Sequence, residues 1–159
     1  RNAIKKNYNP VNSEPMSQGT RCRQLAMYVI FDSPLNMLCD NPSNYKREPE
    51  CTAFIARIPT VWDETLGLDG KVGEYITMAR RSGDEWYVGG LTNWDKRDII
   101  VDLSFLGEGF YEIELFKEGI NADRAACDYK RVVMPVPEDR QLKVTLFPGG
   151  GFAGRIERR

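Results

Sequence analysis

The chain has 159 residues, of which 42% are hydrophobic and 28% are charged, and its net charge is −1. This composition is typical of a globular protein, and the near-zero net charge excludes an overall field that would attract nucleic acid or an anionic membrane surface. There is no histidine, which excludes Ser-His-Asp and Cys-His catalysis and zinc bound through histidine.

The first 18 residues show neither a helical nor a strand period, and they contain two prolines and four asparagines. We expect an irregular, extended lead-in here. A helix follows over residues 20–31 and ends before Pro34. From Leu25 to Phe31 its only polar side-chain group is the hydroxyl of Tyr28, so the helix must be buried on all sides, and nothing earlier in the chain is able to bury it.

Two more helices are expected before the character of the chain changes. Ser33 and Pro34 form an N-cap followed by proline at the first helical position, which predicts a short helix over residues 34–39. Residues 40–45 (DNPSNY) indicate a turn. A third helix begins near Pro49 and ends at Pro59, with one apolar face made of Cys51, Phe54, Ile55 and Ile58.

From Trp62 onward the hydrophobic period is two, as in residues 97–106, and turn signals such as SGDE and PGGG separate the segments. This pattern predicts an antiparallel two-sheet β-sandwich, jelly-roll-like, preceded by short α-helices. We place the boundary between the two parts at residues 62 and 63, giving 1–62 and 63–159. The expected strands are residues 63–69, 73–81, 85–93, 97–106, 110–117, 129–137, 142–146 and 152–157.

The four cysteines, at positions 22, 39, 51 and 127, have neither a CxxC pair nor a tight metal-binding spacing. Three of them, all but Cys127, fall in apolar helical contexts, where a free thiol behaves as a small hydrophobe. We therefore expect buried thiols rather than a disulfide framework. The longest apolar run is far shorter than the ~20 residues that cross a bilayer.

Paired carboxylates such as Glu112 with Glu114 lie on one strand, and this spacing puts both on the same face of a sheet, which we expect to be the solvent face. A glycosidase pair would instead need two carboxyl groups roughly 5–10 Å apart across a cleft. The Asn- and Asp-containing stretch at 118–129 does not match an EF-hand and indicates a hairpin loop. No metal site is predicted within the chain.

Three tryptophans are candidates for stacking on sugar rings if they are exposed on the sandwich. Trp86 and Trp94 lie close together in the sequence, with Tyr87 between them, and Trp62 is a third candidate. Packing in the core or between domains is the competing interpretation of all three.

Several long motifs are recognisable in the chain: PMSQGTRC (15–22), QLAMYVIF (24–31), SPLNMLCDNPSNY (33–45), DGKVGEYITMARRSGDEWYVGGLTNW (69–94), EGINADRAACDYKR (118–131) and PGGGFAGRI (148–156). With these motifs in this order, the chain resembles the C-terminal end of glycoside hydrolase family 97 over essentially its whole length. One departure is Arg23, at a position where many relatives are expected to have histidine.

This resemblance implies a bacterial α-glucosidase or α-galactosidase, periplasmic or secreted, with an N-terminal β-sandwich, a central (β/α)8 barrel and a C-terminal β-sandwich. Residues 20–31 would then be the last barrel helix, residues 1–18 the loop before it, and the rest of the barrel would bury this helix. The catalytic carboxylates and the calcium-binding glutamates would lie upstream of the chain. Calcium is thus implied for the full-length enzyme and not for this part.

We therefore expect the C-terminal part of a glycoside hydrolase that is itself structural and inactive, with no catalytic residue. The lead-in loop could border the sugar pocket through Tyr8, Glu14 and Gln18. The alternatives are a carbohydrate-binding module and an oligomerisation domain. Expected partners are the rest of the barrel, an oligo- or polysaccharide substrate through the parent enzyme, and a second copy of the chain, with no nucleic acid or membrane. The apolar surface left for self-association would be formed by Leu25, Val29, Ile30, Phe54 and Ile55.

Overall fold

The computed structural model describes residues 2–13, 15–38 and 40–159. Within these residues the helices are α1 (Arg21–Ile30), α2 (Pro42–Arg47) and α3 (Pro49–Arg57). Two short strands belong to the lead-in, β1 (Asn2–Ala3) and β2 (Ser17–Gln18). The strands that follow the helices are β3 (Glu64–Lys71), β4 (Tyr75–Ser82), β5 (Glu85–Thr92), β6 (Arg97–Asp102), β7 (Tyr111–Glu118), β8 (Tyr129–Pro135), β9 (Gln141–Leu146) and β10 (Gly151–Arg158).

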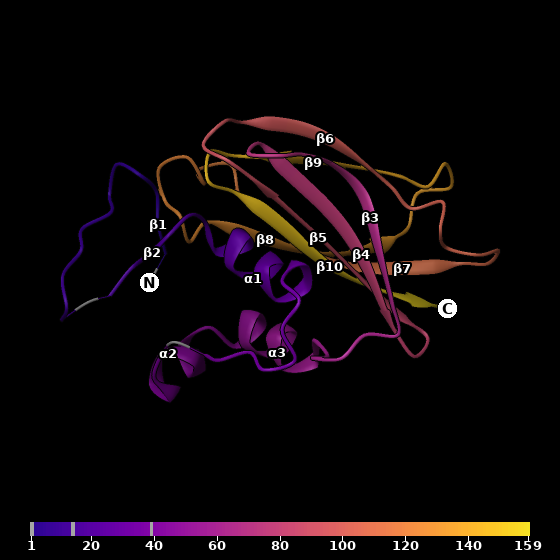
Figure 1. Cartoon of the computed structure of the whole chain (residues 1–159), viewed down its shortest axis with the longest axis horizontal. Coiled ribbons are helices and arrows are strands. Elements are labelled where there is room, and N and C mark those ends of the chain that lie inside the picture. Colours follow the sequence, from indigo (N-terminus) through magenta and orange to yellow (C-terminus); the bar gives the residue numbers. More distant parts are fainter. Residues whose placement is uncertain (1, 14, 39) are drawn as a thin grey trace.

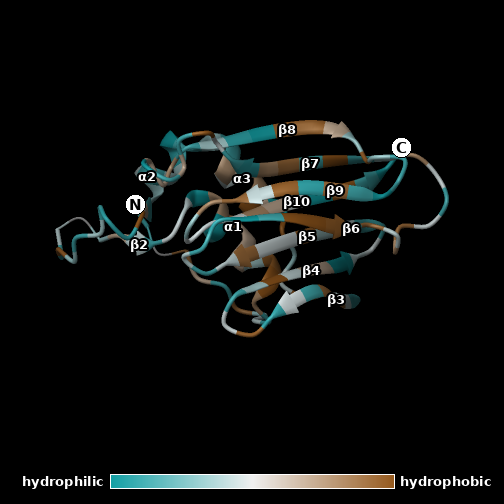
Figure 2. Cartoon of the chain, turned by 90° about the horizontal axis from the view of Figure 1, so that it is seen from above, coloured by the Kyte–Doolittle hydropathy of each residue, from teal (hydrophilic) through white to brown (hydrophobic). Residues whose placement is uncertain are grey.

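The β-sandwich is confirmed, with a large sheet and a small one. Six antiparallel strands form the large sheet in the order β3-β4-β5-β10-β7-β8, and β6 pairs with β9 in the small sheet. Figures 1 and 2 show the small sheet lying over one face of the large sheet, while the helices lie on the opposite face. The main core between the two sheets includes Val88, Val101, Leu103, Ile113, Leu115, Leu142, Val144, Leu146, Phe152 and Ile156.

All eight predicted strands form, and the largest difference in length is at β6. β6 ends at Asp102 rather than at residue 106, because the Asp102 side chain accepts a hydrogen bond from the Ser104 N–H (2.9 Å) and turns the chain. The boundary predicted between residues 62 and 63 falls in the segment that joins α3 to β3, and it stays a prediction.

Helix α1 packs on the face of the large sheet that the small sheet leaves open, mainly against β5 and β10. Thr20 caps the helix by accepting a hydrogen bond from the Arg23 N–H (3.1 Å). The helix approaches the sheet closely at Gly89, since a Cβ added there would lie only 3.2 Å from Val29 Cβ. The large sheet therefore buries one face of the helix, with Leu25 and Val29 at most 1% exposed, while Phe31 is 49% exposed. The expectation that the helix lacks a partner within this chain is wrong, and its further burial by the rest of a barrel stays a prediction.

Helix α3 completes a second, smaller core on the same face of the sheet. Phe54 is fully buried and its ring lies 4.7 Å from that of Phe116 on β7. Cys22 and Cys51 are free and buried beside them, as predicted, and burial raises the pKa of both thiols. Cys127 is free and exposed, and Cys39 lies outside the described residues.

The short helix predicted over residues 34–39 does not form in its described part, 34–38. The Ser33 hydroxyl donates to the Leu35 carbonyl (2.8 Å) instead of capping a helix. Helix α2 occupies residues that were predicted to be a turn, because the Asn41 side chain accepts from the Asn44 N–H (3.0 Å) and Pro42 begins the helix. Among the described residues no helix has the length and apolarity needed to cross a membrane.

Candidate functional site

The two ends of the lead-in segment, residues 2–3 and 17–18, lie side by side. Strands β1 and β2 pair in parallel, with Asn2 opposite Ser17 and Ala3 opposite Gln18. Tyr8 lies in the loop between them, and both Tyr8 and Gln18 are exposed. Glu14 lies outside the described residues. The role of these three side chains at a sugar pocket stays a prediction.

The structure does not bring the two tryptophans of the sugar-stacking prediction together. Trp86 is half-buried against Phe105, with ring centroids 4.5 Å apart. Trp94 packs over Gly149. The two lie at opposite ends of β5, whose eight residues span roughly 25 Å. The two rings therefore do not form one joint stacking site. Stacking of a sugar on Trp86 alone or on Trp94 alone stays a prediction.

Trp62, the third candidate, is engaged in packing near the end of α1. Its ring meets that of Tyr87 edge-on at 5.4 Å, and the Arg80 guanidinium lies 5.7 Å from its centroid. Arg80 is 3% exposed and donates to the carbonyl of Ile30, the last residue of α1 (3.2 Å). A cation at this position is favourable, because the C-terminal end of a helix carries partial negative charge.

The face of the large sheet next to the end of α3 carries an ion-pair network. Glu114 is 8% exposed and is held between Arg57 (2.5 Å) and Arg131 (2.7 Å). The expectation that Glu114 lies on a solvated face is therefore wrong, because Arg57 at the end of α3 covers it. Together with Arg155 and Glu157 these residues line a hollow of about 170 Å³.

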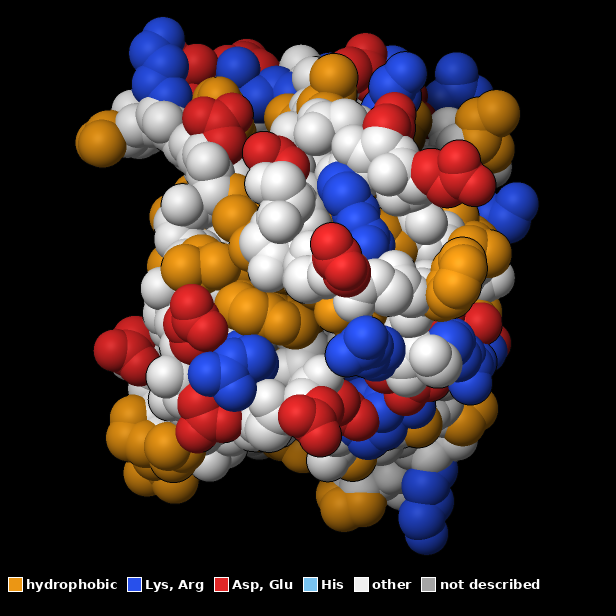
Figure 3. All heavy atoms as spheres, turned by 90° about the vertical axis from the view of Figure 1, so that its right-hand side faces the viewer, with side chains coloured by type: hydrophobic (Ala, Val, Ile, Leu, Met, Phe, Trp, Pro, Cys, Tyr) orange, Lys and Arg blue, Asp and Glu red, His pale blue; other side chains and the backbone are white. Residues whose placement is uncertain are grey.

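The opposite charges are interleaved, so the network has no excess of one sign. Glu112 on the same strand pairs with Arg159, and Glu85 pairs with Arg155. The end of the molecule in Figure 3 likewise shows acidic and basic side chains side by side, without a large field of either sign. The carboxylates here are held in ion pairs, an arrangement that suits packing and specific contacts rather than general acid–base chemistry.

A set of exposed apolar side chains lies in the segment that follows α1. We call Phe31, Leu35 and Leu38 the connector patch; they are 49%, 76% and 49% exposed. The surface predicted for self-association was different, and that prediction is wrong, because the sheet and α3 bury Leu25, Val29, Ile30 and Phe54 and partly cover Ile55. The buried residues are identified by their low exposed fractions.

One buried carboxylate was not singled out by the sequence. Glu118 ends β7, is 8% exposed, and accepts a hydrogen bond from the Phe147 N–H (2.6 Å). Burial raises the pKa of this carboxyl group to about 7, against the smaller opposing effect of its hydrogen bonds. Glu118 is flanked in the sequence by Lys117 and Gly119, so no local pattern indicated that it would be buried.

The described residues contain no group of three or more His, Cys, Asp or Glu side chains that could hold a metal ion. The Asn- and Asp-containing stretch at 118–129 closes on itself instead. Asp128 accepts a hydrogen bond from the Asn121 N–H (2.8 Å), as in a hairpin loop. The absence of a calcium site from this part of the chain stays a prediction.

Comparison with known proteins gives consistent results. Residues 61–157 match the family model described as "Glycosyl-hydrolase 97 C-terminal, oligomerisation". The chain is 67% identical over 157 residues to a retaining α-galactosidase of Bacteroides thetaiotaomicron, covering 99% of this chain and 24% of that protein. It is 31% identical over 130 residues to a probable retaining α-galactosidase of Streptomyces bingchenggensis, covering 82% of this chain and 19% of that protein.

Solved structures agree with the match to glycoside hydrolase family 97. A glycoside hydrolase family 97 enzyme from Pseudoalteromonas sp., in complex with panose, superposes with a TM-score of 0.84 at 34% identity, over 89% of this chain and 23% of the other. A β-arabinopyranosidase superposes with a TM-score of 0.73 at 29% identity, over 86% of this chain and 21% of the other. The chain thus spans about a quarter or less of the length of these relatives.

Proposed function

Since the chain belongs to the C-terminal, oligomerisation family of glycosyl hydrolases 97, we propose that it is the assembly domain of a longer glycoside hydrolase. The match of residues 61–157 to that family carries the proposal. The carboxylates described above add support, because Glu112 and Glu114 are held by arginines rather than facing each other across a cleft.

We propose further that the longer protein is a retaining α-galactosidase, the activity named for both curated relatives. A retaining enzyme uses two carboxyl groups about 5 Å apart, one as nucleophile and one as acid and then base. We assign both groups to the part of the protein outside this chain. The chain alone should then hydrolyse neither aryl α-galactosides nor aryl α-glucosides. Turnover that disappears when one of its own carboxylates is replaced would refute this assignment.

The lead-in suggests where the rest of the longer protein joins. Parallel strands occur almost only in larger sheets that other elements cover on both faces, whereas β1 and β2 have two residues each. We propose that the upstream catalytic barrel extends this pairing. A longer version of the protein that begins upstream should protect the amides of Ala3 and Gln18 from hydrogen exchange better than this chain does, and equal protection would argue against the contact.

For assembly, we propose that the connector patch, which precedes the matched residues 61–157, adds to the contact that these residues make with a second copy. Leu35 and Leu38 offer apolar area on a chain whose net charge is only −1, so little repulsion opposes self-association. Sedimentation velocity should show a concentration-dependent dimer or larger species. Leu35→Asp with Leu38→Asp should make it monomeric, while Val11→Asp, at an exposed apolar side chain in the lead-in, should not. A wild-type chain that remains monomeric at high concentration would refute the assembly role.

Two further proposals concern the longer enzyme and follow from the family resemblance. It binds calcium through residues outside this chain, and it is periplasmic or secreted. Calcium binding is tested by chelating the longer enzyme and measuring its metal content and melting temperature. The location is tested by fractionating the cells, and activity confined to the cytoplasm would contradict it.

A further inference from the structure

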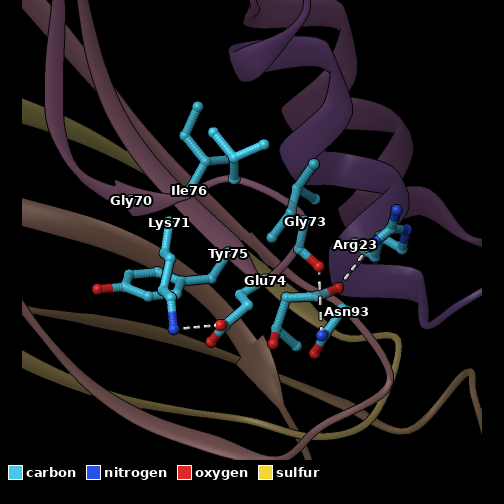
Figure 4. A pocket seen from close by; sticks show the side chains of 11 residues that line it. Arg23, Gly70, Lys71, Gly73, Glu74, Tyr75, Ile76 and Asn93 are labelled. Atoms are coloured by element: carbon cyan, nitrogen blue, oxygen red, sulfur yellow. Dashed lines mark hydrogen bonds and ion pairs between the residues drawn. The ribbon is translucent and has the colours of Figure 1, made fainter.

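An open pocket of about 440 Å³ lies between the start of α1, the β3–β4 hairpin and the end of β5 (Figure 4). Arg23 of α1 lines one side of it. Hairpin residues 70–74 line a second side, and the end of β5 with Asn93 lines a third. Tyr75 and Ile76 at the start of β4 supply an aromatic ring and an aliphatic side chain to the same space.

Arg23 is a partly buried cation without a counter-charge. Its Nη1 donates to the Thr92 carbonyl (2.8 Å), and among the described residues it forms no ion pair with a carboxylate. Burial lowers the pKa of its guanidinium, and no nearby anion raises it. Arg21, two residues earlier, differs in this respect, because it pairs with Glu48 at 2.7 Å.

The position of Arg23 within α1 adds to the shortage of negative charge around its guanidinium. It is the third residue of the helix, and the first turn contains no acidic residue. The N-terminal end of a helix carries partial positive charge, which favours an anion and disfavours a cation. The Arg23 side chain also packs directly on Gly19, where an added Cβ would overlap with Arg23 Cδ.

The other charged residues that line the pocket do not neutralise the positive charge of Arg23. Lys71 and Glu74 pair with each other at 2.5 Å across the hairpin, as Figure 4 shows. Glu74 also pairs with Arg97 at 3.0 Å, and Arg97 in turn pairs with Asp95 at 3.5 Å. The charged residues that line the pocket, Arg23, Lys71 and Glu74, therefore leave one positive charge unpaired, beside apolar surface from Ile76 and Leu91.

We propose that this pocket binds the anionic group of a small ligand, a carboxylate or a phosphate monoester, which pairs with Arg23. The ligand's carbon skeleton packs against Tyr75 and Ile76, and Lys71 contributes a second cation at the rim. A guanidinium presents a planar set of donors that matches both kinds of anion. The volume suits a molecule of the size of an acidic monosaccharide. This site is independent of the proposed assembly role.

Calorimetric titration of the chain at low salt tests the site, with galacturonate, galactose 6-phosphate and neutral galactose as probes. At least one acidic probe should bind at least about tenfold more tightly than galactose. Arg23→Gln should weaken that binding by about tenfold or more, and Arg23→Lys should retain part of it. Arg47→Gln, which removes the same charge from exposed α2, should bind like the wild type.

A second variant keeps the test decisive if Arg23→Gln fails to fold. Ile76→Trp fills the pocket and leaves Arg23 in place, so it should abolish binding in a folded chain. Binding of galacturonate alone identifies a carboxylate ligand, and binding of galactose 6-phosphate alone identifies a phosphate ligand. The proposal is overturned if neither acidic probe binds, if galactose binds equally well, or if Ile76→Trp binds like the wild type.

Discussion

Replacing Glu118 with glutamine should remove a decline in stability that the wild-type chain shows as the pH rises. The carboxyl group lies at the end of β7 and is only 8% exposed, and its pKa is raised to about 7 by burial. Glutamine has the same shape and retains an oxygen that can accept the hydrogen bond from the Phe147 N–H. It has no proton to lose, however, and therefore cannot place a charge at this buried position.

The sign and size of the effect follow from the two pKa values. In the folded chain Glu118 holds its proton up to a pH of about 7, whereas in the unfolded chain it loses the proton near its ordinary pKa of 4.5. The contribution of Glu118 to the unfolding free energy is therefore fully present below pH 4.5. It is lost as the pH rises through 7. The difference corresponds to about 3 kcal/mol of unfolding free energy, most of it between pH 5 and 8.

Urea denaturation followed by tryptophan fluorescence at pH 5, 6, 7 and 8 measures this directly. The unfolding free energy of the wild type should fall over this range, and that of Glu118→Gln should fall by about 2–3 kcal/mol less. Glu138→Gln, at an exposed carboxylate, should retain the wild-type decline. The reasoning is wrong if the wild type and Glu118→Gln show the same dependence on pH.

Three other outcomes are expected. Phe54→Ala should lower the unfolding free energy by about 3–5 kcal/mol in urea denaturation, because it empties a fully buried ring position against Phe116; a loss below about 1 kcal/mol would contradict the packing of α3. Thr20→Ala should cost about 1 kcal/mol through the lost cap of α1, and Thr20→Ser should restore it; equal stability of both variants would speak against the cap. Maltooligosaccharides should leave the tryptophan fluorescence unchanged, because Trp86 packs against Phe105; a saturable change that Trp86→Ala abolishes would instead support sugar binding.

The strands were predictable because period-two alternation and turn residues are local signals. Their order was not, since β10 lies between β5 and β7 through contacts between distant parts of the chain. The small sheet is a similar case, because the pairing of β6 with β9 joins segments about forty residues apart. No local pattern specifies such a pairing.

The surroundings of α1 were mispredicted because apolarity alone does not say what covers a helix. The large sheet covers the helix at a region where small residues allow a close approach. Gly89 and Ala153 are the small residues that face the helix. Helix α2 was missed for another reason. Ser33-Pro34 and Asn41-Pro42 carry the same start signal, and only Asn41 uses its side chain as a cap.

The candidate sites depended even more on tertiary structure. Arg23 was noted in the sequence only as a departure from a family pattern, because a missing counter-charge can be recognised only once all neighbours are placed. Glu118 and Arg80 are comparable, since their burial results from elements distant in the sequence.

The central place of β10 has a consequence for how the chain folds during synthesis. It is the last sandwich strand to leave the ribosome, yet β5 and β7 each need it as a neighbour. Until it arrives, these two strands have open edges and the incomplete sheet is prone to pair with other chains. We therefore expect the sandwich to form only after β10 is available, and aggregation to compete with folding until then.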